Sequence, residues 1–405
     1  MSCNRKMDYK ILSNYYYKDR AMYEEEFKKR KEIIGCINYD FDIKGFNAFI
    51  VSVPEITKLI ADIYKMNNEI EKKLQILPNV ARERYKINCL IDEIMLTNDI
   101  EGVHSTHKEI TDVIDTVIFD KKKRFAGLIK KYELLLNEKA LIPLETCKNI
   151  RDLFDEIVGN EIEQKDASDG QYFRRKSVVI LTSTQKIKHE GVLPEEKINE
   201  LMIKALTILN SNSAQTLINA AAFHYLFGYI HPFYDGNGRV NRFITSCVLA
   251  KELSPIVAYR ISYAINNEKN HYYKAFEICN DMKNKGDLTS FVITFLELIS
   301  KAITNLCDKL NEGIEKISFY YGIIEKKYNP EVKKNEHYYK MLSLLIQNDL
   351  FGFEDFDRNL LSQISGLNYQ TVTKIMKNLI DLGEPITAFK DGHKIRYNLR
   401  LEDLS

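Results

Sequence analysis

The 405-residue sequence lacks any uninterrupted run of about 18 apolar residues, and its first twenty residues lack the apolar core of a secretory signal. Its seven cysteines form an odd set without a Cys-x-x-Cys pair, which disfavours a disulfide framework and a zinc ribbon. We therefore expect a soluble, cytoplasmic protein with reduced thiols and no membrane partner.

Neither sign of charge dominates the chain. Lys and Arg number 58 and Asp and Glu 57, so the formal net charge is +1. This balance does not imply a dominant polyanion-binding surface, although a local basic patch stays open. The hydrophobic content of 45% and the charged content of 28% are typical of a globular protein, and the length suggests two or three domains.

Most of the chain has helical periodicity. Apolar residues recur at spacings of three and four after Pro54, which predicts an amphipathic helix over 54–77 and a second over 81–102. Residues 1–50 are polar and rich in tyrosine, and their charged run at 23–32 indicates a solvated helix face. We expect further helices over 126–136, 144–158, 195–210, 214–230, 239–253, 271–285 and 287–306.

Two stretches depart from this pattern. Residues 172–194 are β-branched and interrupted by polar residues, which predicts a short strand or hairpin. Near the C-terminus, residues 357–383 indicate helix, turn, helix, and two strand-like runs then flank Asp391-Gly392, a strong hairpin signal. A helix-turn-helix followed by a hairpin is the winged-helix arrangement.

The run YIHPFYDGNGRVNRF, residues 229–243, concentrates polar chemistry just before a predicted helix. Gly236, Asn237 and Gly238 precede that helix, whose first N–H groups lack intrahelical acceptors and point outward. Together with the helix dipole they form an anion site, and the glycines let a phosphate approach the backbone. Arg239 and Arg242, at i and i+3, share a face and could each bind a phosphate.

Two further residues of this run suit phosphoryl chemistry. Asp235 offers a hard oxygen ligand of the kind that Mg²⁺ takes beside substrate phosphates. His231 titrates near neutrality and could accept a proton from an attacking hydroxyl. The alternative is a helix-connecting turn with a capping asparagine and solvent-facing arginines. The convergence of several chemical roles within twelve positions favours a site.

Residues 231–242 match H-P-F-x-D-G-N-G-R-x-x-R at every defined position, and the chain thereby resembles the Fic family over about 125–305. The resemblance implies a compact helical fold that transfers AMP from ATP to a hydroxyl of a protein Tyr, Thr or Ser, uses Mg²⁺ and releases pyrophosphate. Doc-like relatives, which have Lys in place of Gly238, are kinases, so Gly238 favours nucleotidyl transfer. Self-modification and a homodimer are further expectations.

The resemblance also implies a role for each matched residue. By this resemblance, His231 would be the base that activates the target hydroxyl, and Asp235 would hold Mg²⁺. Asn237, with the Gly236 and Gly238 amides, would hold the α-phosphate. Arg239 and Arg242 would bind the β- and γ-phosphates. Residues 178–191 resemble the family's hairpin flap, which could pair with an extended target segment; an ordinary surface hairpin is the alternative. Tyr272 and Tyr273 are candidate adenine contacts, although aromatic pairs at helical spacing are more often core residues.

Residues 97–102, TNDIEG, resemble the family's inhibitory motif, Ser/Thr-x-x-x-Glu-Gly/Asn, as it occurs N-terminal to the catalytic domain in the class II branch. It begins at Thr97 and contains Glu101. A Glu101 carboxylate paired with Arg242 would remove one phosphate contact and place negative charge where the γ-phosphate must lie. A solvated acid at a helix end is one alternative. Another is a glutamate that positions water to remove AMP from a modified target.

We therefore predict a mostly α fold: a Fic-type helical bundle with a short β-hairpin flap, an N-terminal helical segment and a C-terminal winged helix-turn-helix. The predicted domains are an N-terminal helical region over 1–120, a catalytic domain over 121–305, a helical connector over 306–335 and a winged helix over 336–405. The predicted function is AMP transfer restrained by Glu101, with ATP as substrate and Mg²⁺ as cofactor.

The rival prediction is a DNA-binding regulator with a nucleotide-sensing Fic unit; kinase-like transfer and de-AMPylation also stay open. Residues 336–401 hold eight basic and eight acidic residues, a net of zero, so nonspecific attraction to DNA would be modest. This balance favours a protein partner or a dimer for the winged helix.

Overall fold

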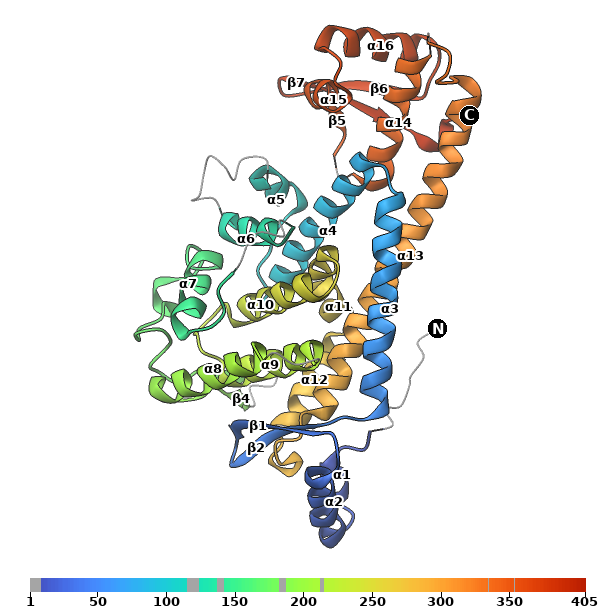
Figure 1. Ribbon diagram of the computed structural model, residues 1–405. Helices are drawn as coiled ribbons and strands as arrows, with labels where there is room; N and C mark the ends of the chain where they lie inside the picture. The colour runs from blue at the N-terminus through green and yellow to red at the C-terminus, as the bar shows by residue number, and fades with distance from the viewer. Residues whose placement is uncertain are drawn as a thin grey trace. The chain divides into compact units, whose positions relative to one another are not determined.

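The computed structural model describes residues 9–114, 124–136, 142–181, 187–211, 215–333, 335–352 and 354–405. Helices dominate this part of the chain: it contains sixteen α-helices and seven short β-strands (Figure 1). The predicted mostly α fold is confirmed.

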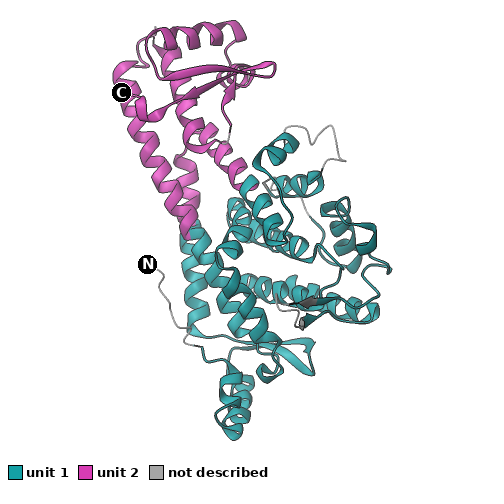
Figure 2. Ribbon diagram, turned by 180° about the vertical axis from the view of Figure 1, so that it is seen from behind, with its two compact units in different colours: residues 1–67, 91–303 teal, residues 68–90, 304–405 magenta. Residues whose placement is uncertain are grey.

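The chain divides into two compact units (Figure 2): residues 1–67 with 91–303, and residues 68–90 with 304–405. Three helices have residues in both units: α3 (Pro54–Ile76), α4 (Asn79–Ile100) and α13 (Thr289–Lys327). Helix α13 runs without a break into the stretch predicted as a connector, since its apolar periodicity continues there. It is also long and apolar enough to cross a membrane, but 72% of its most apolar window is buried within the fold, as in a core helix.

The N-terminal region holds more than the predicted helix. Helices α1 (Leu12–Tyr16) and α2 (Arg20–Glu32) are followed by an antiparallel hairpin of β1 (Cys36–Ile43) and β2 (Phe46–Val51). This hairpin was not predicted from the sequence, although Tyr39, Phe41 and Ile43 are buried at alternate positions, the period of a strand with one face on the core.

The core of the first unit is built around α9 (Thr216–Ile230), in which nearly every residue is buried. A helix that is apolar on all sides must be surrounded by other elements. It packs against α8 (Glu195–Leu209) and α10 (Asn237–Glu252), and α10 in turn packs against α6 (Ala126–Leu136) and α7 (Cys147–Ile157) (Figure 1). The loop between α9 and α10 is therefore held between two core helices.

The predicted hairpin is present as β3 (Val179–Leu181) and β4 (Ile187–Glu190), which pair antiparallel. Residues 182–186 of the predicted flap lie outside the described residues. The remaining elements of this unit are α5 (His107–Ile114), η1 (Gln164–Asp166), η2 (Pro255–Arg260), α11 (Ile261–Asn267), α12 (Lys269–Asn280) and η3 (Met282–Asn284).

The second unit contains the predicted helix-turn-helix and hairpin. Its elements are α14 (Glu336–Phe351), β5 (Phe356–Asp357), α15 (Arg358–Ser365), α16 (Tyr369–Asp381), β6 (Ile386–Asp391), β7 (Lys394–Leu399) and η4 (Leu401–Asp403), with the strands in the order β5-β7-β6. Gly366, with φ +70°, ends α15, and the Asn368 side chain caps α16 by accepting a hydrogen bond from the Thr371 N–H. Helix α14 was not predicted.

Candidate active site

The motif loop, residues 231–238, reverses the chain between α9 and α10. His231 closes α9 in the left-handed conformation, with φ +51°, and its N–H donates to the Phe227 carbonyl oxygen at 2.9 Å. Gly236, with φ +76°, is the N-cap of α10, and a Cβ there would lie 3.0 Å from Val158 Cγ2. Only glycine meets both demands without strain.

Asn237 braces the loop from inside. Its side-chain Oδ1 accepts from the Phe233 N–H at 2.9 Å, and its Nδ2 donates to the Phe233 carbonyl oxygen at 2.8 Å. Each end of this buried amide makes one bond to the loop backbone, so the side chain holds the loop in shape, and its contact with an α-phosphate stays a prediction. An anion bound at this loop would also meet the first N–H groups of α10, which have no intrahelical acceptors.

The surroundings of His231 favour the neutral form of its imidazole. Its side chain is partly buried, and burial, reinforced by the nearby His189 and the Arg174 cation, lowers its pKa to about 3. The imidazole is therefore neutral at physiological pH, and the expectation from the sequence that it titrates near neutrality is corrected, because burial disfavours its charged form. Tyr234, at the variable position of the motif, donates to Asp169 Oδ1 at 2.8 Å and accepts from the Lys176 N–H at 2.9 Å, which ties the loop to the segment leading into β3.

Asp235 is the exposed carboxylate of the loop, and its Oδ1 accepts from the Gly236 N–H at 2.6 Å. Within the described ranges, no group of three or more His, Cys, Asp or Glu side chains could hold a metal ion. A metal at Asp235 would therefore need oxygen ligands from a substrate. This donor set fits Mg²⁺, which binds through one or two carboxylates, water and phosphate oxygens.

Arg242 is fully engaged by the end of α4. Its Nη1 pairs with Glu101 Oε1 at 2.8 Å, its Nε donates to Thr97 Oγ1 at 2.8 Å and its Nη2 donates to the Thr97 carbonyl oxygen at 2.9 Å. Burial alone would lower the pKa of Arg242, but the Glu101 carboxylate raises it overall. The contact between Glu101 and Arg242 that was expected from the sequence is present.

Gly238 lies directly against that carboxylate. A Cβ at Gly238 would meet Glu101 Oε1 at 2.0 Å, so the acid occupies the surface of the first turn of α10. Negative charge is favoured at a helix N-terminus. The Glu101 carboxylate therefore lies in the region where the anion-binding prediction places a phosphate.

Arg239 has a carboxylate partner that was not predicted from the sequence. Its Nη1 pairs with Glu161 Oε2 at 2.7 Å, and both side chains are largely buried. Burial raises the pKa of Glu161, and Arg239 opposes that rise. Glu161 lies in an acidic loop after α7 that resembles any solvated turn in the sequence. Neither arginine of the motif is solvent-facing, so the alternative of a simple connecting turn does not hold.

Tyr272 belongs to the core. It is 6% exposed, and its hydroxyl contacts His224 Nε2 at 2.8 Å, while His224 Nδ1 contacts Thr245 Oγ1 at 2.7 Å. His224 is thus a core histidine with a partner at each ring nitrogen. The burial of Tyr272 favours the alternative that it is a core residue over the suggested adenine contact. Tyr273 is 37% exposed. Burial raises the pKa of its hydroxyl group, and the nearby Glu101 carboxylate raises it further.

Glu93 anchors the face of α4 that leads to Thr97 and Glu101, one and two turns later. This fully buried carboxylate accepts from the Ser262 N–H at 2.9 Å, from Ser262 Oγ at 2.6 Å and from the Tyr132 hydroxyl at 3.2 Å. Burial raises the pKa of Glu93 to about 7. Glu93 was not singled out from the sequence.

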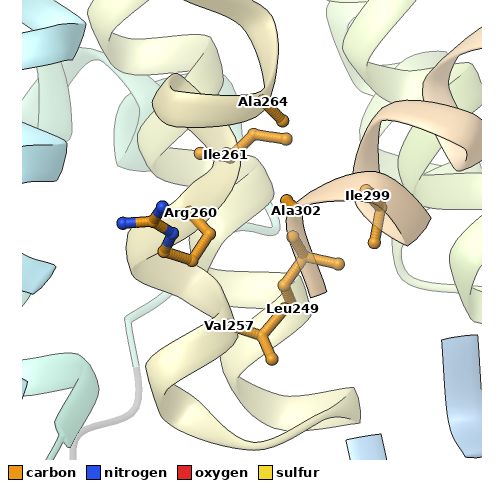
Figure 3. Close-up of a pocket in the computed structure, with 7 residues that line it drawn as sticks. All are labelled: Leu249, Val257, Arg260, Ile261, Ala264, Ile299 and Ala302. Atoms are coloured by element: carbon orange, nitrogen blue, oxygen red, sulfur yellow. The ribbon is translucent and has the colours of Figure 1, made fainter. Parts of the chain in front are cut away.

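A small pocket lies elsewhere in the first unit (Figure 3). It is lined by Leu249, Val257, Arg260, Ile261, Ala264, Ile299 and Ala302. None of these residues belongs to the motif loop, and all but one are aliphatic, so this pocket offers no chemistry for the transfer of a phosphate-containing group.

Comparisons with known proteins agree with this site. The model of the Fic/DOC family matches residues 144–249. The protein adenylyltransferases Fic of Drosophila grimshawi and Drosophila virilis are 26% and 27% identical to the chain over 234 and 239 residues; each match covers 56% of this chain and 44% of the relative. The chain thus spans less than half the length of these relatives.

A crystal structure of a Fic family protein from Desulfovibrio desulfuricans G20 shares the fold. Its TM-score is 0.51 at 20% sequence identity, over 86% of this chain and 96% of that one. The motif and the matched model lead to one conclusion: residues 144–249 of this chain form a domain of the Fic/DOC family.

Proposed function

We propose that the protein transfers AMP from ATP to a hydroxyl side chain of a protein target. The observation that carries this proposal is the placement of a neutral imidazole, His231, and the N-terminus of α10 at the two ends of one short loop. The name of the relatives, protein adenylyltransferase, supports the same chemistry.

In the proposed reaction the hydroxyl oxygen of the target attacks the α-phosphorus of ATP. The bond from that phosphorus to the oxygen bridging the α- and β-phosphates breaks, and pyrophosphate leaves. His231 takes the proton of the hydroxyl group. The first N–H groups of α10 stabilise the charge on the α-phosphate, and Arg239 and Arg242 hold the outer phosphates once their carboxylate partners release them.

Mg²⁺ is part of the proposal, and Asp235 would hold it. When bound, it would neutralise charge on the phosphate oxygens. Asp235 already accepts the Gly236 N–H through one oxygen, which orients the carboxylate at the start of α10.

Glu101 restrains the reaction in this proposal. Its carboxylate occupies Arg242 and the surface over Gly238, so the outer phosphates of ATP cannot take their productive position. The same acid could instead orient water for removal of AMP from a modified target. Self-modification and a cytoplasmic location complete the proposal; the odd set of cysteines without a Cys-x-x-Cys pair supports the latter.

The decisive experiment compares ATP labelled at the α-phosphorus with ATP labelled at the γ-phosphorus, with magnesium present. The proposal expects label in protein from the α position alone, its loss in His231→Ala, and its increase in Glu101→Gly. Label from the γ position alone would establish kinase-like chemistry instead. No label from either, together with sequence-selective DNA retention that survives His231→Ala, would favour the rival DNA-binding regulator.

A further inference from the structure

Arg174 is a fully buried arginine whose guanidinium donates to three main-chain carbonyl groups. Nε donates to the His231 oxygen at 2.9 Å, Nη1 to the Lys176 oxygen at 2.7 Å and Nη2 to the Val192 oxygen at 2.8 Å. Among the described residues no carboxylate lies within ion-pair distance of it. A cation removed from water without a counter-ion is costly, so these three carbonyl groups must compensate.

Residues on both sides of the β3–β4 hairpin also cap the C-terminal end of α9. The last carbonyl groups of a helix have no intrahelical donors. Here the Ile230 carbonyl oxygen accepts from the Val192 N–H at 3.1 Å, and the Pro232 carbonyl oxygen accepts from the Arg174 N–H at 3.1 Å. With the His231 bond from Arg174 Nε, three consecutive carbonyl groups at the start of the motif loop are satisfied from the residues that flank the β3–β4 hairpin.

These bonds fix an unusual backbone. A residue other than glycine in the left-handed conformation persists only where its surroundings hold it. At His231 the N–H is held by Phe227 and the carbonyl group by Arg174. With both sides of the residue fixed, the direction in which its imidazole leaves the chain is fixed too.

Gly191 independently indicates that the guanidinium belongs in this place. A Cβ at Gly191 would lie 2.3 Å from Arg174 Nη2, so a side chain there would displace the guanidinium. The Gly191 N–H also donates to the Val178 carbonyl oxygen at 3.0 Å, which joins the two stems of the hairpin, residues 176–178 and 190–192.

We propose that Arg174 is a positioning residue for His231: its guanidinium joins the main chain of His231 to both stems of the hairpin and so keeps the imidazole in one orientation relative to them. The inference rests on the proposed function, in which this imidazole takes the proton of a target hydroxyl. Arg174 lies outside the motif and, in this inference, acts through His231 without contacting the substrate.

The test uses the full chain and the variant Arg174→Lys. An ammonium group keeps the charge but cannot reproduce three bonds fanned out from one plane. We expect hydrogen exchange, followed by mass spectrometry, to become about tenfold faster in peptides covering both 189–193 and 229–234. We also expect kcat for AMP transfer to fall by about tenfold or more while the KM for ATP stays nearly constant, since a slightly misplaced base slows the chemical step.

Arg30→Lys is the matched control, because Arg30 is also buried and donates to Glu26, Asp287 and the Lys10 carbonyl oxygen, none of which belongs to the loop or the stems. Arg30→Lys should leave the rate of hydrogen exchange unchanged in both peptides. Gly191→Ala, which leaves Arg174 in the chain but fills its space, should reproduce the faster exchange and decides the matter if Arg174→Lys does not fold.

Unchanged exchange of either peptide in both variants would overturn the inference, and so would a kcat that falls no further than in the control. If the wild-type protein transfers no AMP at all, the proposed function fails, and the two exchange measurements alone decide whether Arg174 holds His231 to the hairpin.

Discussion

Glu101 and Arg242 form a direct ion pair, with 2.8 Å between Glu101 Oε1 and Arg242 Nη1, and the arginine is buried while the acid is only 23% exposed. The pair joins the end of α4 to the first turn of α10. An arginine proposed to hold a phosphate of ATP is thus already bound by an acid of the same chain. Under the proposed function, the free energy of this pair would oppose productive binding of the nucleotide.

Replacing Glu101 by Gly should raise the rate of AMP transfer. The change frees the guanidinium and removes negative charge from the surface over Gly238, and even ~1.4 kcal/mol of released restraint corresponds to about a tenfold higher rate. The measurement is incorporation of label from ATP labelled at the α-phosphorus. Asp99→Asn is the control, since Asp99 lies on the same helix but is exposed and pairs with Lys269. Equal rates for wild type and Glu101→Gly would show that the ion pair does not restrain the enzyme.

Replacing Thr97 by Val should release the restraint only in part. Valine has the shape of threonine but lacks Oγ1, which accepts from Arg242 Nε at 2.8 Å, whereas the carbonyl oxygen that accepts from Nη2 remains. A hydrogen bond to a charged group contributes about 1.5–3 kcal/mol, so unfolding by urea should show a loss in this range. The transfer rate should lie between those of wild type and Glu101→Gly. A rate below that of wild type would mean that Thr97 orients Arg242 for the reaction.

Replacing Glu161 by Gln should lower the melting temperature of the free protein. It should also increase the amount by which added MgATP raises that melting temperature. The substitution leaves Arg239 buried without its counter-ion, and phosphate oxygens can supply the missing charge. If the affinity rises about tenfold, the rise in melting temperature should exceed that of wild type by about 2 °C. Glu163→Gln, which removes an exposed acid paired with Lys165, is the control. A smaller rise than in wild type would mean that Glu161 prepares Arg239 for ATP.

The motif loop could be predicted because its chemistry is contiguous in the sequence. His231, Gly236 and Arg242 fall within twelve positions, and the apolar periodicity on both sides places the loop between helices. The partners of the two arginines are a different matter. Glu161 lies 78 residues before Arg239 in a loop that also contains other acids, so no local pattern marks it. Glu101 was found only through the resemblance of its segment to an inhibitory motif.

Arg174 shows why buried charges are hard to predict from a sequence. It stands in the run FRRK, which indicates a solvated basic segment, yet its neighbour Arg175 is exposed while Arg174 is buried. The difference arises from tertiary structure, since the carbonyl groups that Arg174 binds come from three separate segments. The β1–β2 hairpin was missed for another reason: its alternating pattern is visible, but the tyrosine-rich, charged surroundings favoured a helix.

Acid should destabilise the protein through His224. Burial, followed by the Arg242 charge, lowers its pKa to about 3 from the ordinary 6.5. Between these values the unfolded chain binds more protons than the folded protein, so stability rises with pH through this window and is lost as pH falls towards 3. The slope for one such histidine is about 1.4 kcal/mol per pH unit. Glu93 has the opposite effect on stability, because burial raises its pKa from the ordinary 4.5 to about 7. Between these two pH values the folded protein binds the proton more readily than the unfolded chain does, so this contribution to stability falls as pH rises.

The two effects separate when His224→Asn is compared with wild type, since Glu93 is common to both. The free energy of unfolding by urea, measured between about pH 4 and 6, should depend on pH less steeply in His224→Asn, by about 1.4 kcal/mol per pH unit. The variant will be less stable throughout, because the Tyr272 hydroxyl and Thr245 lose the ring that joins them, but the slope is independent of that constant loss. His337→Asn, a change at an exposed position, measures the effect of removing a histidine from the surface. Parallel curves for wild type and His224→Asn would mean that His224 takes up its proton in the folded protein as readily as in the unfolded chain, and hence that the ring is not enclosed by Thr245 and Tyr272 in solution.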